Sequence, residues 1–381
     1  MKLPATLVRT AAVARKEGWH ILRDWRSLLM ALAIPALMLL LFGYALTLDV
    51  DRVPLAVWDQ DGSPESRELI ARFAGSRYFT LLAFVDSYAP IERMIDENRC
   101  MLALVIPPDF GRTLRSGGAA EPQLIVDGSN SNTAMIALGY AEALVRAYSF
   151  QLQAHDLEAK GGGKLKVPVD PQPRVWYNSE LQSRNYIVPG LIAVILMIIA
   201  AMLTSLTIAR EWENGSMEQL LSTPVRAHEI VLGKMAAYFA LGAVDTVAAM
   251  LLGVVVFHVP LRGSLLLVVA SSAVFMMGGL FWGIFLSAAT RNQLEAYQMG
   301  MVTSFLPAFL LSGFIFAIEN MPAVIQAVSY IFPSRYFITI LKGVFLKGIG
   351  LQVLWTELAF LSLYALVVFA AATRKLKQRI A

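Results

Sequence analysis

The sequence predicts a polytopic α-helical membrane protein that carries one small α/β domain outside the membrane. Hydrophobic residues make up 57% and charged residues 16% of the 381 residues, whereas soluble proteins have about 45–50% and about 25%. Six stretches are long and apolar enough to cross a bilayer as helices, which takes about 20 residues each. One long polar stretch, residues 49–184, separates the first of these from the second.

The six predicted spans are residues 27–48, 186–209, 235–257, 264–289, 296–318 and 351–372. Lys and Arg accumulate in short cytoplasmic segments, and here they gather in residues 1–26 and in the tail 373–381. Both termini and the 210–234 loop are therefore predicted to be cytoplasmic. Residues 49–184 then lie on the periplasmic or extracellular side of a bacterial inner membrane.

Two apolar segments before the last span, residues 323–332 and 336–346, are each too short to cross. Joining them into one span would place Arg335 near the bilayer centre, at a cost of about 2.5–3.5 kcal/mol. We expect two re-entrant or interfacial helices on the outer side, in the region 319–350. A partly exposed amphipathic loop is the alternative.

The outer domain is predicted to contain strands at 54–58, 79–85, 101–106 and 123–126 and helices at 64–73, 91–98 and 133–153. Ser63 followed by Pro64 favours a helix start, because Ser caps free amides and Pro suits the first position. A loop rich in Gly and Pro, from Lys160 to Pro173, leads back to the membrane. The pattern indicates a domain that receives substrate, docks a partner or forms a lid.

Few residues in this domain suggest chemistry. The segment from Asp59 to Gly62 lacks the third oxygen ligand and the final Glu of an EF-hand, so we interpret it as a strand-to-helix turn. Cys100 is the only cysteine, which excludes an intrachain disulfide and multi-cysteine metal sites. We predict no catalytic residue and no metal site in the chain.

The cytoplasmic loop after the second span contains a short amphipathic helix. A break is expected at Asn214-Gly215, a helix at 216–222 and a stop at Pro224. Ser216 is the expected N-cap and Glu218 lies in the first turn, where the helix dipole favours negative charge. Met217, Leu220 and Leu221 supply the apolar face.

This loop resembles the signature of the ABC-2 family of transporter permeases, the membrane subunits of ATP-binding-cassette exporters. The matching residues are Arg210-Glu211, Gly215-Ser216, Met217-Glu218-Gln219-Leu220, Thr223-Pro224 and Gly233-Lys234. The order of parts along nearly the whole chain is similar to the subgroup with a large outer domain. An element similar to the family's Pro-x-x-Tyr-Phe precedes the last span, with Pro333, Arg335, Tyr336 and Phe337.

The resemblance implies that residues 211–224 form a coupling helix that docks on a nucleotide-binding subunit. The implied coupling residues are Arg210, Glu211, Glu213, Gly215, Ser216, Met217, Glu218, Gln219, Leu220 and Pro224. An ordinary surface helix that shields the bilayer edge is the alternative. Residues 5–25 are implied to lie along the inner membrane surface as a connecting helix, and an apolar stripe beside basic residues supports this. That stripe consists of Leu7, Ala11, Ala14, Gly18, Ile21, Leu22 and Trp25.

Energy must come from another chain. A P-loop needs Gly-Lys followed by Ser or Thr, whereas Gly163-Lys164 and Gly233-Lys234 precede Leu165 and Met235. The expected partners are a separate ABC ATPase, as two copies or a tandem, which holds ATP and Mg²⁺, and a second permease copy or paralogue. Membrane lipid and a periplasmic adaptor are further partners, and no cofactor in this chain and no nucleic acid are expected. Small residues at 278–279, 283 and 288–289 suit close helix packing, between copies or within one chain.

Asp245 is the carboxylate deepest in a predicted span. Such a residue faces a bundle interior or a wet cavity, so it is a candidate for the substrate path or, alternatively, for fastening helices together. Met197, Met202, Met276, Met277, Met299 and Met301 either line an adaptable path or pack in the core.

The leading functional hypothesis is an exporter subunit that moves an amphipathic or hydrophobic substrate, such as a drug, a lipid or a glycolipid. A membrane-anchored receptor or scaffold that binds a ligand through its outer domain is the alternative. An ion-coupled secondary transporter would need inverted repeats, which the sequence lacks, and a membrane enzyme is least favoured.

Overall fold

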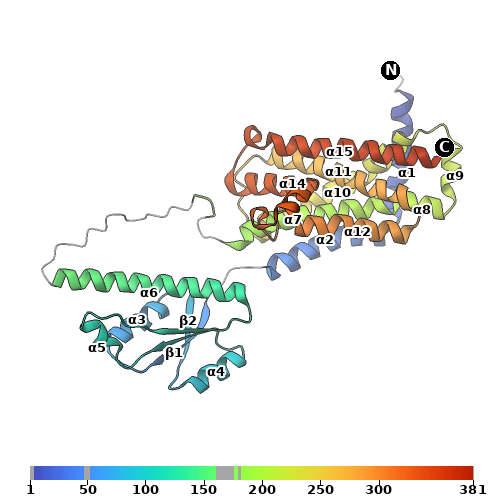
Figure 1. Ribbon diagram of the computed structural model, residues 1–381. Coiled ribbons are helices and arrows are strands. Elements are labelled where there is room, and N and C mark those ends of the chain that lie inside the picture. The colour runs from blue at the N-terminus through green and yellow to red at the C-terminus, as the bar shows by residue number, and fades with distance from the viewer. Residues whose placement is uncertain (1–3, 47–51, 160–175, 179–181, 381) are drawn as a thin grey trace. The chain divides into compact units, whose positions relative to one another are not determined.

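The computed structural model describes residues 4–46, 52–159, 176–178 and 182–380 (Figure 1). The chain divides into a helical unit, residues 1–47 and 175–381, and an α/β unit, residues 48–174. The predicted Gly- and Pro-rich loop from Lys160 to Pro173 lies outside the described residues.

The α/β unit contains a four-stranded sheet in the order β2-β1-β3-β4, with β4 antiparallel to β3 and the other pairs parallel. Every predicted strand and helix of this unit is confirmed, with ends shifted by a few residues, and a short helix α5 is added. The elements are β1 (Val53–Asp59), α3 (Pro64–Ala74), β2 (Phe79–Phe84), α4 (Tyr88–Asp96), β3 (Leu102–Ile106), α5 (Phe110–Arg115), β4 (Gln123–Val126) and α6 (Ser131–Ala159).

Helices cover both faces of this sheet. Phe73 of α3 and Ala137 of α6 share one core cluster with Leu55 of β1, whereas Ile91 of α4 packs with Ala103 on the opposite face. Because β3 lies inside the sheet and under helices on both faces, all five of its residues are buried, as expected of a central strand in an α/β layer fold.

The predicted caps and turns of the α/β unit are confirmed. Ser63 Oγ accepts a hydrogen bond of 3.1 Å from the Ser66 amide at the start of α3. Asp59 Oδ1 accepts from the amides of Asp61 and Gly62 at 3.1 and 3.0 Å. These carboxylate contacts with backbone amides make the segment a strand-to-helix turn.

The helical unit begins with α1 (Ala5–Arg23) and α2 (Trp25–Ala45), and continues after the α/β unit with α7. Its further elements are α7 (Ser183–Ser205), α8 (Thr207–Glu213), α9 (Ser216–Leu221), α10 (Ala227–Leu251), α11 (Leu265–Thr290), α12 (Gln293–Leu310), α13 (Ala323–Ser329), α14 (Pro333–Lys342) and α15 (Leu351–Ile380). Short π-helical segments, Leu252–Val256 and Gly343–Lys347, extend α10 and α14.

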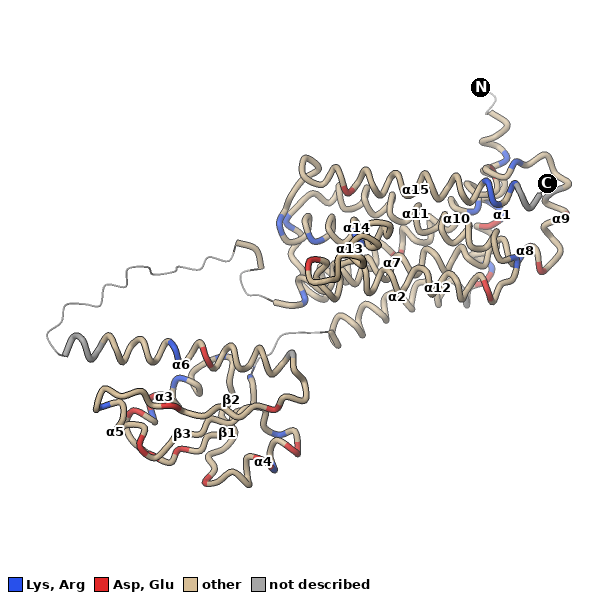
Figure 2. The backbone as a smooth tube through the Cα atoms, in the orientation of Figure 1, with Lys and Arg blue, Asp and Glu red and all other residues tan. Residues whose placement is uncertain are grey.

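Among the described residues, five helical segments are long and apolar enough to cross a membrane: Leu28–Ala45, Ser183–Glu213, Ala227–Val256, Leu265–Thr290 and Leu351–Lys377. The helices Ala323–Ser329 and Pro333–Lys347 meet at a bend of 86°, so they form either a re-entrant pair or one broken sixth span. In the helical unit, most Lys, Arg, Asp and Glu residues lie near its two ends (Figure 2).

The predicted fifth span is shorter than expected, and α12 is not among the five segments. The prediction extended it to residue 318, but α12 ends at Leu310. Gly313 then takes a left-handed conformation with φ of 78°. Its carbonyl accepts hydrogen bonds from Tyr186 Oη at 3.0 Å and Lys342 Nζ at 2.9 Å. Side chains from α7 and α14 thus bind the backbone just beyond the end of α12.

The centre of the helical unit is α7, which is buried at nearly every position from Ile187 to Ala201. Glycines of α11 allow neighbours to approach closely: a Cβ added at Gly279 would lie 2.8 Å from Ala200 Cβ, and one at Gly283 would lie 2.1 Å from Thr204 Oγ1. A Cβ at Gly278 would lie 2.9 Å from Tyr364 of α15. These three glycines therefore pack helices within one chain.

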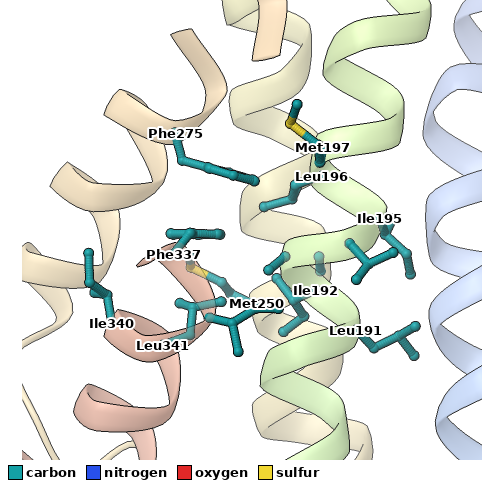
Figure 3. Packing of buried hydrophobic residues seen from close by; sticks show 14 of the residues in the cluster. Leu191, Ile192, Ile195, Leu196, Met197, Met250, Phe275, Phe337, Ile340 and Leu341 are labelled. Atoms are coloured by element: carbon teal, nitrogen blue, oxygen red, sulfur yellow. The ribbon is translucent and has the colours of Figure 1, made fainter. Parts of the chain in front are cut away.

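The predicted element before the last span forms the beginning of α14. Phe337 is fully buried and stacks on Phe275 of α11 with ring centroids 4.2 Å apart (Figure 3). Tyr336 stacks on Phe360 of α15 at 5.0 Å. Arg335 lies over the Tyr330 ring at 3.7 Å.

Pro333 occupies the first turn of α14, where its missing amide hydrogen costs no hydrogen bond. The Arg335 side chain also donates to Ser329 Oγ and to the Gln326 carbonyl at the end of α13. The arginine therefore holds the two short helices at their bend.

Candidate functional site

The predicted coupling segment consists of two short helices, α8 and α9, joined by a sharp turn, and we call this pair the α8–α9 hairpin. Residues 214 and 215 separate the two helices, and Gly215 takes a left-handed φ of 70°. The expected N-cap was wrong: Gly215 occupies the cap position, and Ser216 is the first helical residue, with Oγ donating to the Glu211 carbonyl at 3.4 Å. Glycine adopts this left-handed conformation without a steric clash between a side chain and the backbone. Gly215, rather than Ser216, therefore occupies the N-cap position.

Helix α9 has one buried and one exposed side, as its amphipathic pattern predicts. Met217 is 1% exposed and packs in a cluster with Ile230 of α10 and Val368 of α15. Glu218 and Gln219 point to the exposed side, and the exposed surface continues through Glu213, Gly215, Ser222, Thr223 and Pro224. The hairpin therefore offers a polar surface on an apolar anchor. The side chain of Leu221 lies outside the described residues.

The first arm of the hairpin is fixed to α12. The Glu213 carboxylate accepts a hydrogen bond from the Gln293 amide at 2.8 Å and a second from the Gln293 side chain. Arg210 Nε donates to Gln293 Oε1 at 3.5 Å. Two of the predicted coupling residues thus position the hairpin relative to α12.

A buried charge cluster lies where α1, α8 and α10 meet. We define it as the buried residues Glu17, Glu211 and Lys234 together with Lys16, an exposed residue at its edge. Lys234 Nζ lies 2.6 Å from Glu17 Oε1 and 2.8 Å from Glu211 Oε1, and Lys16 Nζ contacts the same Glu211 oxygen at 2.8 Å. Lys234 is 1% exposed and the two glutamates are each 6% exposed.

Sequence reasoning found only part of this cluster. Glu211 belonged to the implied coupling residues and Lys234 to the matching motif, but Lys16 and Glu17 had no assigned role. A signal was present: Glu17 is an acidic residue within a basic, otherwise apolar helix, and Lys234 borders a predicted span. Charges in such positions need a counterion.

A second ionic contact joins α1 to the far end of the hairpin. Arg9 Nη1 donates to the Pro224 carbonyl at 2.7 Å and lies 3.7 Å from Glu229 Oε2. Arg9 and Lys16 are seven residues apart, which is two helical turns or about 10.5 Å along one face. Helix α1 therefore contacts the chain just before α9, at Glu211, and just after it, at Pro224.

The face of α1 that packs into the protein differs from the predicted apolar stripe. Val13 and Glu17 are its buried residues, whereas Leu7, Leu22 and Trp25 of the stripe are all more than half exposed. The close packing follows from Gly233 of α10, which allows the α1 backbone to approach. The expected contact of the stripe with a membrane surface stays a prediction.

A cavity of about 640 Å³ lies between α2, α7, α10 and α12. Ligand-binding pockets commonly measure about 300–1,000 Å³ and are mostly apolar with a few polar groups. The lining follows that pattern, with His20, Asp24, Arg210, Tyr238 and Tyr297 toward the α9 end. Its other members are Ile21, Leu28, Met30, Ala31, Ile34, Pro35, Met38, Ile198, Ile199, Met202, Leu203, Leu206, Leu241, Met301 and Phe305.

The methionines divide between the two predicted positions, and a role in a substrate path stays a prediction. Met202 and Met301 line the cavity, whereas Met197 and Met276 are buried in the main apolar core. Four of the lining residues are methionines, whose flexible thioethers adapt to ligands of different shape.

Asp245 lies on α10 one turn beyond the cavity residue Leu241. Its side chain is buried, with 1% exposure, and neither carboxylate oxygen has a hydrogen-bond partner among the described residues. Burying a carboxylate without hydrogen-bond partners destabilises the fold. Packing alone therefore does not account for an aspartate at position 245.

Residues 25–374 match the model of the family described as ABC-2 family transporter protein. The chain is 36% identical over 374 residues to the probable multidrug ABC transporter permease YbhS of Escherichia coli, covering 98% of this chain and 97% of that protein.

Two further relatives are similar over nearly the whole chain. The probable multidrug ABC transporter permease YbhR of Escherichia coli is 32% identical over 368 residues, with 96% of each chain covered. ABC transporter G family member 20 of Dictyostelium discoideum is 22% identical over 364 residues, which are 95% of this chain and 50% of that protein.

Proposed function

Because the chain belongs to the ABC-2 family of transporter permeases, whose members work with ABC ATPases, we propose that it forms half of an export pathway for amphipathic or hydrophobic molecules. A separate ATPase docks on the α8–α9 hairpin and supplies the energy. The observation that carries this proposal is the hairpin itself, an exposed polar surface anchored by Met217 and joined to three other helices.

The hairpin is suited to transmit movement. Its exposed residues Glu218 and Gln219 are free of the apolar anchor and available to a protein partner, while Glu211 and Glu213 connect it to α10 and α12. A push on α9 thus reaches helices that line the cavity. ATP and Mg²⁺ belong to the partner, and the chain itself contributes no catalytic residue to this proposal.

The cavity supports the proposed class of substrate. Its wall is apolar along α2 and α7, and its polar groups are at the α9 end. A molecule with an apolar body and a polar group fits that gradient, because its polar group stays hydrogen-bonded while its apolar part leaves water. Drugs, membrane lipids and glycolipids share this chemistry, and the names of two relatives refer to multidrug transport.

Asp245 extends this path toward the other end of α10 in our proposal. A carboxylate without partners is available to a passing polar or cationic group. The alternative role, fastening α10 to a neighbouring helix, would need a partner that neither oxygen has among the described residues.

The proposal also fixes orientation and assembly. The α9 end, with the basic ends of α1 and α15, faces the cytoplasm of a bacterial inner membrane, and the α/β unit lies on the periplasmic side. A second permease copy or a paralogue completes the pathway, and a periplasmic adaptor contacts the α/β unit. Membrane lipid surrounds the exposed apolar faces of α2 and α15.

The test is affinity purification of the chain from its native membrane, followed by measurement of ATP hydrolysis in the eluate. We expect an ABC ATPase to co-purify with the unaltered chain and to be lost from Glu218→Lys, which reverses a charge on the exposed side of α9. Glu121→Lys, on the exposed surface of the α/β unit, is the matched control. Retention of the ATPase by Glu218→Lys, or its absence from the unaltered chain, would favour a receptor or scaffold instead.

A further inference from the structure

The buried charge cluster lies next to the polar end of the cavity. Each of Glu17, Glu211 and Lys234 lies no more than about one helical turn from a cavity residue on its own helix. The cavity residues in question are His20 and Ile21 on α1, Arg210 on α8 and Tyr238 on α10. Displacement of any of these three helices by a ligand therefore displaces a member of the cluster.

We propose that Lys234 is a positioning residue that makes the position of the α8–α9 hairpin depend on occupancy of the cavity. This inference rests on the proposed function and names the link between its two sites. Lys234 touches neither the cavity nor the exposed surface of α9, so it acts through Glu17 and Glu211. A ligand that moves α1 or α10 changes these contacts, and Glu211 passes the change to the hairpin.

Both lysine contacts of Glu211 are made by one carboxylate oxygen, Oε1. Glu211 Oε1 receives both Lys234 and Lys16, while Glu211 Oε2 has no hydrogen-bond partner among the described residues. Rotation of the Glu211 carboxylate therefore disturbs both contacts together. Because charges in a buried site are unfavourable without counterions, the cluster favours discrete arrangements over gradual deformation, as a switch requires.

Lys234 contacts carboxylates on two different helices, which distinguishes it from Arg9 of α1. Its ammonium is shared between Glu17 on α1 and Glu211 on α8, and it also lies 3.4 Å from the Thr207 carbonyl. Arg9, in contrast, reaches the Pro224 carbonyl and is one-third exposed. The Arg9 contact braces α1 against the hairpin but lies three turns from the nearest cavity residue, His20.

The experiment uses the complete complex of the chain with its co-purifying ATPase, in lipid nanodiscs. The probes are two amphipathic fluorescent dyes, the cationic rhodamine 6G and the uncharged Nile red. Dye affinity is measured by fluorescence anisotropy, and ATP hydrolysis is measured with and without dye. The informative quantity is the ratio of dye-stimulated to basal hydrolysis.

We expect Lys234→Met to bind dye with the Kd of the unaltered complex while its stimulation ratio falls to one. Glu17→Gln preserves the side-chain shape and leaves Lys234 paired with Glu211, so a smaller loss of stimulation is expected. Arg15→Met is the control, because Arg15 is an exposed basic residue of the same helix. Its ratio should equal that of the unaltered complex.

A double variant, Lys234→Met with Glu17→Met, separates positioning from folding. It removes the buried ammonium together with one of its carboxylates, while Glu211 retains Lys16. Apolar replacement of a buried ion pair commonly preserves stability. A purely structural cluster predicts that stimulation returns in this variant, whereas our proposal predicts a stable complex whose ratio stays at one.

Two results overturn the inference. Normal stimulation in folded Lys234→Met or in the double variant shows that the cluster does not connect the two sites. Failure of both dyes to stimulate the unaltered complex has a different meaning, because it contradicts the proposed transport function on which the inference rests.

Discussion

Gly233 of α10 lies directly against Val13 of α1. A Cβ added at Gly233 would lie 2.6 Å from Val13 Cβ and 2.9 Å from the Thr10 carbonyl oxygen, so only glycine permits this approach. The contact brings Glu17, one turn beyond Val13, to Lys234. The missing side chain of Gly233 therefore allows the close approach of α1 that gives Lys234 its counterion Glu17.

Substitution Gly233→Ala should separate α1 from α10 and weaken the cluster. We expect destabilisation by about 1–3 kcal/mol, the usual effect of overpacking, measured by the thermal unfolding midpoint and by protease release of α1. Gly18→Ala is the matched control in α1, because a Cβ there meets no atom within 4 Å. Equal effects of the two substitutions would contradict the role of close packing.

Substitution Asp245→Asn should impair transport without preventing assembly. The change preserves size but removes a carboxylate whose oxygens have no partners, so folding gains rather than loses and only a role in the substrate path is affected. Efflux of rhodamine 6G from whole cells and recovery of the assembled complex are the two measurements. Unchanged efflux would remove Asp245 from the proposed path.

Substitution Phe337→Ala should destabilise the helical unit by about 3–5 kcal/mol, as truncation of a fully buried aromatic residue does. Its ring stacks on Phe275 and is fully buried, so truncation removes these contacts and leaves a cavity in the core. Unfolding midpoints in detergent test this. Phe316→Ala, at a side chain that is 58% exposed, should shift the midpoint much less, and similar shifts would refute the importance of the stack.

Acidification should loosen the α3–α5 region of the α/β unit. Hydrogen bonds from the Ser63 side chain and the Gly111 amide hold the pKa of Asp61 below its ordinary 3.8, and the Glu65 backbone amide, followed by Arg115, holds the pKa of Glu65 below its ordinary 4.5. Because both pKa values are lowered by folding, their stabilising effect is complete at neutral pH. It is lost as the pH falls through the folded-state pKa values.

Hydrogen exchange of α3 and α5 in the full chain, corrected for intrinsic rates, measures this loss between neutral and acidic pH. Asp61→Asn should reduce the pH dependence, because Asn has no carboxylate that becomes protonated as the pH falls. Glu121→Gln, at an exposed residue of the same unit, should leave it unchanged. Identical profiles for all three proteins would refute the assignment.

Much of the fold is encoded locally and was therefore predictable. Apolar length gives the spanning helices, and the alternation of strands and helices gives the α/β unit with Ser63 as a helix cap. Errors occurred where a neighbour distant in sequence intervened. Helix α12 ends at Leu310, and the Gly313 carbonyl beyond it accepts hydrogen bonds from Tyr186 and Lys342. No local pattern records these donors.

The candidate site was predicted as a segment but not as a structure. The motif from Arg210 to Pro224 identified the hairpin, yet it gave no indication that Lys16 and Glu17 join it. Lys234 and Glu17 are 217 positions apart, and single-sequence periodicity carries no information on such pairs. The prediction of Ser216 as N-cap was wrong, because the left-handed residue Gly215 precedes the helix and occupies the cap position.

By itself, the amino-acid sequence determined the membrane class, the helices, the α/β domain and the family resemblance, since these depend on hydropathy, periodicity and short motifs. Only the tertiary structure decided which charges pair, which methionines line the cavity and which face of α1 is buried. The physical reason is that a buried charge or cavity is defined by atoms from several helices, whose meeting depends on packing across the whole unit.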